Sequence, residues 1–171
     1  EDLISRGCDA LIISGRLSEE MFNTVDEITD KAVFLSCSEV NQERKKNLFY
    51  DYGSGTREAL ENLIALNHRH IRMIGNRWND FHSDLRPLTF LEVLKQHELP
   101  MEHPICVLNE ETELTVDFMK DFLQDDPDCT AIFCSNDFLA MRVIQSCTGL
   151  GLRIPDDISV IGFDDIDASA C

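Results

Sequence analysis

Short apolar runs alternate along this chain with segments whose apolar residues recur at every third or fourth position. An apolar run of about four residues is typical of a strand buried on both faces, and the longer spacing is typical of a helix with one buried side. The runs predict strands at residues 10–13, 32–35, 48–50, 71–74, 105–108, 131–134 and 158–161. The alternation therefore predicts an α/β fold with parallel sheets and helices on both faces.

Residues 130–165 show this pattern most clearly and add candidate ligand chemistry. The strand 131–134 ends at Ser135-Asn136-Asp137, residue types that cap helices, and the strand 158–161 ends at Gly162-Phe163-Asp164-Asp165. Parallel strands joined by a helix end at the same edge of the sheet, and open α/β sheets bind ligands at that edge. We therefore expect Asn136 and Asp164 to lie near a ligand site. The helix between the strands is expected to bury Ala140, Val143, Ile144 and Cys147.

Several pieces of the chain occur in the order and at the spacing of a known family. They are A-I-F-C-S-N-D at 131–137, Ala140, G-L-R-I-P at 151–155 and D-I-S-V-I-G-F-D-D at 157–165. A further match is the helix pattern of Gly55, Ala59 and Leu63, followed by Asn67-His68 where the family has Gly-His. In these pieces the chain resembles the effector-binding core of the LacI/GalR family of bacterial transcription repressors.

The resemblance implies a periplasmic-binding-protein-like fold of type I, built from two Rossmann-like parallel-sheet subdomains, the first of them incomplete here. Residues 1–66 would be part of the N-terminal subdomain, and residues 67–171 would form the C-terminal subdomain. Next to this boundary, Asn67 replaces the family's glycine and is the next best residue for a left-handed helix exit. A helix-turn-helix headpiece would lie outside this chain.

The composition is that of an ordinary globular protein, with 43% hydrophobic residues and a formal net charge of −17. This charge opposes the sign needed to bind a phosphate backbone, so direct contact of this chain with nucleic acid is not expected. No apolar run is long enough to span a membrane. The seven cysteines include no C-x-x-C pair, and several fall within expected strands and helices. We interpret them as reduced core residues of a cytoplasmic protein.

Two kinds of bound group are not expected from the motifs. The five histidines follow no metal-ligand pattern, which argues against a metal site. Gly53-Ser54-Gly55 is expected to form a glycine-rich turn before a helix, and such a turn can hold phosphate. Glu58 occupies the place of the third glycine of a dinucleotide fingerprint, so we predict no nucleotide and no other cofactor.

A cleft between two subdomains is a natural site for a small molecule, and a sugar needs paired polar groups because each hydroxyl both donates and accepts. Arg86 offers a rigid donor fork, and Asp164 offers a carboxylate that can accept from two hydroxyls. The resemblance assigns both to effector binding together with Asn136, although Asn136 could equally be only a helix cap. The full set of expected effector-binding residues is Arg86, Asp164, Asn136, His82, Ser36 and Tyr50.

The preferred interpretation is a binding module, the effector-binding and dimerisation core of a sugar-responsive LacI-type repressor. Ligand would change the closure of the two subdomains and so alter operator binding by the headpiece. The resemblance places part of a homodimer contact on the helix after Asn136, at Phe138, Met141 and Arg142.

Two other functions stay open from the sequence. One is a periplasmic-type sugar-binding protein of the same architecture. The other, less favoured, is a hydrolase that uses Asp137, Asp164 and Asp165 as acid–base carboxylates. Adjacent residues on an extended strand point in opposite directions, so Asp164 and Asp165 are not expected to act as a facing pair.

Overall fold

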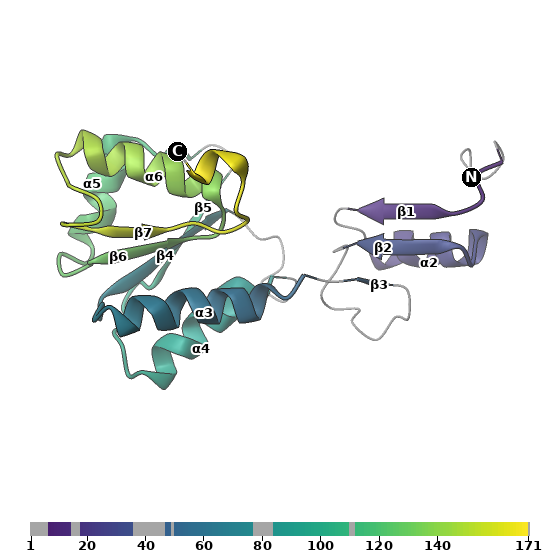
Figure 1. Ribbon diagram of the computed structural model, residues 1–171, viewed down its shortest axis with the longest axis horizontal. Helices are drawn as coiled ribbons and strands as arrows, with labels where there is room; N and C mark the ends of the chain where they lie inside the picture. The colour runs from purple at the N-terminus through teal and green to yellow at the C-terminus, as the bar shows by residue number, and fades with distance from the viewer. Residues whose placement is uncertain are drawn as a thin grey trace. The chain divides into compact units, whose positions relative to one another are not determined.

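The computed structural model describes residues 7–14, 18–35, 47–48, 50–76, 84–109 and 112–170. These residues form two compact units: a first unit up to Asp51, joined by Asp84, and a second unit from Tyr52 onward. Each unit combines helix with a parallel sheet, which confirms the predicted α/β class (Figure 1). Within the described residues no helix is both long enough and apolar enough to cross a membrane.

The first unit holds a three-stranded parallel sheet in the order β1-β2-β3. Its elements are β1 (Leu11–Ser14), α2 (Glu19–Ile28), β2 (Ala32–Leu35) and β3 (Asn47–Leu48). Ser18 caps α2, because its hydroxyl accepts a hydrogen bond from the N–H of Met21 at 3.2 Å. Phe22 of α2 packs on Phe34 of β2 with ring centroids 4.6 Å apart, which joins the helix to the sheet.

The second unit holds a four-stranded parallel sheet in the order β5-β4-β6-β7. Its strands are β4 (Ile71–Asn76), β5 (Ile105–Leu108), β6 (Ala131–Cys134) and β7 (Ser159–Ile161). Its helices are α3 (Tyr52–Ala65), α4 (Leu85–Gln96), α5 (Val116–Gln124) and α6 (Asp137–Gly149), with a short 3-10 helix η2 (Asp167–Ala170). Helices α3 and α4 cover one face of the sheet, and α5 and α6 cover the other (Figure 1).

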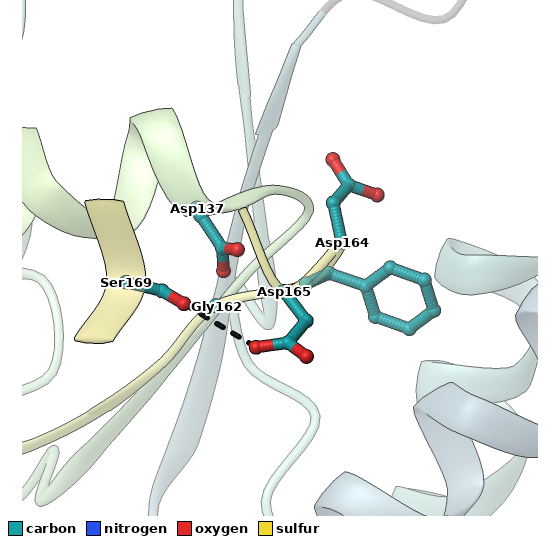
Figure 2. Close-up of a pocket in the computed structure, with 6 residues that line it drawn as sticks. Asp137, Gly162, Asp164, Asp165 and Ser169 are labelled. Atoms are coloured by element: carbon teal, nitrogen blue, oxygen red, sulfur yellow. Dashed lines mark hydrogen bonds between the residues drawn. The ribbon is translucent and has the colours of Figure 1, made fainter. Parts of the chain in front are cut away.

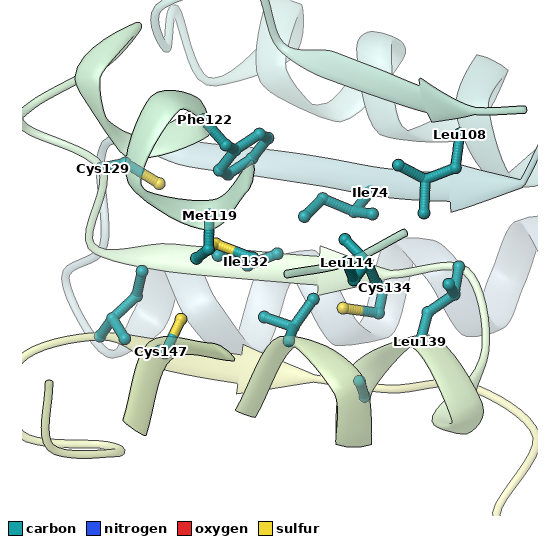
Figure 3. Close-up of a cluster of buried hydrophobic side chains, with 13 residues drawn as sticks. Ile74, Leu108, Leu114, Met119, Phe122, Cys129, Ile132, Cys134, Leu139 and Cys147 are labelled. Atoms are coloured by element: carbon teal, nitrogen blue, oxygen red, sulfur yellow. The ribbon is translucent and has the colours of Figure 1, made fainter. Parts of the chain in front are cut away.

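Strand β6 is buried along its whole length because alternate side chains enter two different cores. Ile132 and Cys134 join the cluster under α5 and α6, where they meet Ile74 of β4 (Figure 3). Ala131 and Phe133 join the opposite cluster under α3 and α4. This double burial is the physical reason for the unbroken apolar run in the sequence.

The described cysteines are all free thiols, and most of them behave as core residues. Cys129, Cys134 and Cys147 are buried, whereas Cys8 is exposed. Burial raises the pKa of the Cys129 and Cys147 thiols to about 11, so both stay protonated at neutral pH. These three side chains therefore pack as small apolar groups, as the sequence interpretation expected.

Helix α3 starts earlier than the sequence predicted, and it ends as predicted. It begins at Tyr52, so Gly53 and Gly55 lie in its first turn and not in a loop before it. Asn67 beyond its end has a φ of 72°, the left-handed exit predicted for that position. Leu60 and Leu63 of α3 pack in the core of the second unit, which therefore starts before the boundary expected near residues 66–68. The position of the subdomain boundary in a complete core stays a prediction.

The predicted burial of Ile144 is wrong. The buried apolar residues of α6 are Leu139, Ala140, Val143 and Cys147, and Ile144 is 39% exposed. Three- and four-residue spacing defines the buried side of a helix only to about one position, and Ile144 falls beyond its edge. Ile144 therefore adds apolar area to the outer surface of α6.

Candidate functional site

The carboxyl end of the second unit's sheet brings several elements to one edge. Strands β4, β6 and β7 are parallel and in close register, with Ile74 beside Cys134 and Phe133 beside Ile161. Two residues separate the end of β6 from the start of helix α6, and the chain after β7 turns at Asp164 and Asp165, whose φ angles are positive. Open α/β sheets bind ligands at this edge, so its side chains are the candidate site.

Arg86, in the first turn of α4, is the central cation of this edge. Its side chain is half-buried, and its Nη1 donates a hydrogen bond of 2.5 Å to the carbonyl of Ser135 at the end of β6. The guanidinium carbon lies 4.7 Å from the ring centroid of Tyr52 and 5.4 Å from that of Phe163. A carbonyl and two aromatic rings therefore fix the direction of the guanidinium fork.

Phe163 connects the turn after β7 to the helices beneath it. Its ring centroid lies 5.9 Å from that of Tyr52 and 6.3 Å from that of Phe133, which it meets edge-on. A Cβ built on Gly55 would lie 3.0 Å from the Cζ of Phe163, so the ring packs directly on the backbone of α3. The absence of a side chain at Gly55 makes this close approach possible.

The turn after β7 places Asp164 and Asp165 at the surface in an unusual backbone conformation. Their φ angles are 103° and 53°, both positive, and both side chains are exposed. Asp137, buried at 6% exposure, holds the turn because its Oδ2 accepts a hydrogen bond of 2.9 Å from the N–H of Ile166. A Cβ on Gly162 would collide with the Asp137 carboxylate, so that position needs glycine.

A pocket of about 310 Å³ opens at this turn (Figure 2). The carboxylates of Asp164 and Asp165 point away from the turn in different directions (Figure 2). The Oγ of Ser169 donates a hydrogen bond of 3.4 Å to the Oδ1 of Asp165. Carboxylates accept hydrogen bonds only, so this side of the site suits a ligand that is rich in donors. The residues that line the pocket are Asp137, Gly162, Phe163, Asp164, Asp165 and Ser169.

Asn136 has a structural task that the sequence left open. Its Oδ1 accepts a hydrogen bond of 2.9 Å from the N–H of Leu139, which is the N-cap arrangement of α6. The side chain remains half-buried at the ligand edge. The helix-cap interpretation is therefore confirmed, and a ligand contact by Asn136 stays a prediction.

The structure brings together some of the expected effector-binding residues. Arg86 and Asp164 both belong to the carboxyl edge of the second unit. Tyr50 belongs to the first unit and is 66% exposed, and Ser36 and His82 lie outside the described residues. The aromatic contacts of Arg86 with Tyr52 and Phe163 are absent from the sequence prediction, although Phe163 stands inside the quoted G-F-D-D motif.

The geometry does not support the hydrolase alternative. Asp164 and Asp165 lie in a turn beyond the end of β7, so the expectation that they sit on an extended strand is wrong. Asp137 is occupied by the N–H of Ile166, which gives it a structural role. Among the described residues, no group of three or more His, Cys, Asp or Glu is arranged to hold a metal ion.

Comparison with known proteins identifies the family to which this site belongs. The profile of the periplasmic-binding-protein-like domain matches residues 60–171, the part of the chain that carries Arg86, Phe163 and Asp164. The chain belongs to this family. Within it, the chain corresponds to part of the effector-binding core of LacI-type regulators.

Two curated repressors illustrate the relationship. The probable HTH-type transcriptional repressor ExuR of Bacillus subtilis (strain 168) is 36% identical over 124 residues, which cover 72% of this chain and 37% of that repressor. The lactose operon repressor of Escherichia coli (strain K12) is 26% identical over 174 residues, which cover 99% of this chain and 47% of that repressor. The chain therefore spans less than half the length of either relative. Both relatives are transcriptional repressors and not enzymes.

A solved structure agrees with the sequence matches. The Lac repressor dimer bound to operator and the anti-inducer ONPF matches this chain with a TM-score of 0.78 and 25% identity. The match covers 99% of this periplasmic-binding-protein-like chain and 59% of the repressor chain. The fold predicted from the family resemblance is thus the fold of LacI-type regulators.

Proposed function

We propose that the carboxyl edge of the second unit binds a small polyhydroxylated effector, a sugar or a sugar derivative, within a LacI-type repressor. The observation that carries the proposal is the guanidinium of Arg86, which Ser135 orients at 2.5 Å and which two aromatic rings flank. An oriented donor fork is suited to adjacent hydroxyls or to a carboxylate, and neighbouring carboxylates such as Asp164 supply matching acceptors.

The residues divide the recognition of the effector between donors and acceptors. Arg86 donates from one side of the site, and Asp164 accepts from the turn after β7. Asp137 holds the backbone of this turn by accepting a hydrogen bond from the N–H of Ile166. A sugar hydroxyl can satisfy both at once, because it donates and accepts in the same contact. Asn136 is a third candidate contact. His82, Ser36 and Tyr50 complete the proposed set and would enter the site only in the complete core.

Operator binding belongs to a different part of the intact protein in this proposal. The chain carries a net charge of −17, which disfavours contact with a phosphate backbone. Effector binding would change the closure of the two subdomains and so the geometry of a DNA-reading headpiece outside this sequence. The protein would act in the cytoplasm, where its free thiols stay reduced.

Dimerisation through α6 is the second part of the proposed function. Phe138 is 65% exposed on this helix, Arg142 is exposed, and Met141 between them is half-buried. An apolar surface next to a charged residue suits a contact with a second copy of the chain. Met141→Glu should weaken self-association of the intact protein in sedimentation experiments, while Met101→Glu, at a 44% exposed methionine outside α6, should not. Equal behaviour of the two variants would argue against this interface.

A ligand panel on the intact protein tests the effector proposal. Thermal shift measurements with hexoses, hexuronates, sugar phosphates and purine bases should show stabilisation by a polyhydroxylated compound, because a ligand that binds only the folded state raises its stability. The shift should be much smaller in Arg86→Ala at the same ligand concentration. Stabilisation by a purine base alone, or a sugar response of unchanged size in Arg86→Ala, would contradict the proposed site.

A further inference from the structure

The ring of Phe163 touches three different elements of the second unit at the effector edge. It meets Tyr52 from α3 at 5.9 Å and Phe133 from β6 at 6.3 Å between ring centroids. The guanidinium carbon of Arg86 from α4 lies 5.4 Å from the Phe163 centroid. Asp164 is the next residue in the chain. One side chain therefore connects the two residues to which we assign effector binding.

Gly55 controls how far this ring enters between the elements. A Cβ at position 55 would stand 3.0 Å from the Cζ and 3.2 Å from the Cε2 of Phe163, closer than ordinary carbon contacts. Gly55 lies inside α3, where alanine stabilises a helix more than glycine does. The glycine thus weakens the helix locally, and in return it lets the aromatic ring rest on the helix backbone.

The geometry points to Phe163 as a positioning residue, seated by Gly55, that holds the Arg86 fork and the Asp164 turn in the arrangement that the effector needs. The inference rests on the proposed function, because that proposal assigns Arg86 and Asp164 to the effector. Phe163 acts through these two residues: it supports the guanidinium from the side opposite to a polar ligand and fixes the backbone just before Asp164. A displaced ring moves both groups together.

A purely structural role for Phe163 makes a different prediction. The ring contributes to the core under α3 and α4, so a change there could lower stability and ligand affinity together. If Phe163 is a positioning residue, a substitution at Gly55 should change ligand affinity without a matching change in stability. Gly55→Ala favours the helix while it displaces the ring, so stability should change little and effector recognition should suffer.

Gly149 provides the matched control in the same unit. It is the last residue of α6, and a Cβ there would stand 2.6 Å from the Cγ2 of Val116. Gly149→Ala therefore also forces a methyl group against a side chain, that of the 39% exposed Val116, but at a helix-to-helix contact that involves none of Arg86, Phe163 and Asp164. It should lower stability without affecting the effector site.

The test uses the intact protein and reads Arg86 directly by nuclear magnetic resonance. The guanidinium N–H protons of Arg86 report the hydrogen bond to Ser135 through their exchange with water, and their chemical shifts report the two rings. Gly55→Ala should shift these resonances and speed their exchange, and Gly149→Ala should leave both unchanged. If Gly55→Ala does not fold, Phe163→Leu, which adds no atoms, should speed the same exchange. Unchanged Arg86 exchange in the folded variant would overturn the inference.

Calorimetric titration with D-glucose, D-galactose and D-galacturonate as probes supplies the functional readout. Gly55→Ala should weaken the binding of a probe sugar by about three- to tenfold, the effect of losing part of one directed hydrogen bond. In a Phe163→Leu background Gly55→Ala should have no further effect, because the clashing ring atoms are gone. Additive losses in the double variant would contradict the positioning role. If none of the three probes binds the unaltered protein, the proposed function fails for these three sugars. The inference about Phe163 is then decided by the exchange of the Arg86 N–H protons alone.

Discussion

Two arginines of the second unit make the same kinds of contact but differ in burial. Arg72 lies in β4 and is 3% exposed, with its guanidinium carbon 3.7 Å from the ring centroid of Phe122. Its Nε donates to the carbonyl of His103 at 3.1 Å, and its Nη1 donates to the carbonyl of Phe122. Arg86 also donates to a backbone carbonyl and also lies beside aromatic rings, but it remains half-buried at the ligand edge.

The difference shows what separates a structural arginine from a candidate ligand-binding arginine. Arg72 ties together β4, the last turn of α5 and the loop before β5. Its Nε and Nη1 are directed to protein carbonyls, and its Nη2 lies 3.9 Å from the Oδ2 of Asp125. A buried guanidinium is tolerated only when its donors are satisfied in this way. Arg86 is held on one side by Ser135 and keeps part of its surface in contact with solvent, where a ligand can replace water.

The largest effect that this comparison predicts is on stability, from Arg72→Ala. The change leaves the buried carbonyl of Phe122 without its donor and opens space beside the Phe122 ring. We expect the free energy of unfolding to fall by roughly 2–4 kcal/mol, measured by denaturant titration of the intact protein. Ligand affinity of the remaining folded protein should be unaltered. A stability loss as small as that of a surface substitution would remove the distinction between the two arginines.

Arg86→Ala should show the opposite behaviour, with a large loss of affinity and a small loss of stability. Hydrogen bonds to charged groups contribute roughly 1.5–3 kcal/mol, which corresponds to about ten- to a hundredfold in effector affinity. Ser135 is buried, but Arg86 is only half-buried, so water can enter the space that the guanidinium leaves and reach the Ser135 carbonyl. The free energy of unfolding should therefore change by only about 1 kcal/mol. The matched control is Arg69→Ala, because Arg69 also donates to backbone carbonyls, those of Ile64 and His68, at the other end of α3.

Asp164→Asn should weaken effector binding by about tenfold, because the amide loses one acceptor and the negative charge. Asparagine tolerates positive φ angles better than most residues, so the turn should keep its shape at the φ of 103°. The neighbouring variant Asp165→Asn is the control, since Asp165 accepts its hydrogen bond from Ser169. Calorimetric titration of both variants should separate them. Equal losses would indicate a general charge effect of the turn and not a specific contact by Asp164.

The fold was accessible from the sequence because burial on two faces leaves unbroken apolar runs, as in β6. The cap at Asn136 was accessible as well, because this residue stands where α6 needs an acceptor for its first N–H groups. The residues at the ligand edge and their contacts could be predicted from the sequence only in part. Family resemblance pointed to Arg86 and Asp164, but no local pattern relates Tyr52 at the start of α3 to Phe163 after β7, because packing of distant elements creates that contact.

The glycines illustrate the same limit in physical terms. Glycines before a helix predict a loop turn. Gly53 and Gly55 instead lie within α3, in its first helical turn. The reason for Gly55 is the ring of Phe163, and the reason for Gly162 is the carboxylate of Asp137. Both reasons are tertiary contacts, so neither could be read from local sequence.

The smallest predicted effect concerns the second ring beside Arg86. Tyr52→Leu removes the aromatic face that lies 4.7 Å from the guanidinium carbon and keeps an apolar side chain at the start of α3. A cation–π contact at a partly exposed site contributes about 0.5–1 kcal/mol, so effector affinity should fall by about two- to fivefold. Tyr52→Phe keeps the ring and should retain the affinity of the unaltered protein. If Tyr52→Phe loses as much as Tyr52→Leu, the phenol hydroxyl and not the ring supports the site. In that case Arg86 would resemble Arg72 less than the ring contacts of the two arginines suggest.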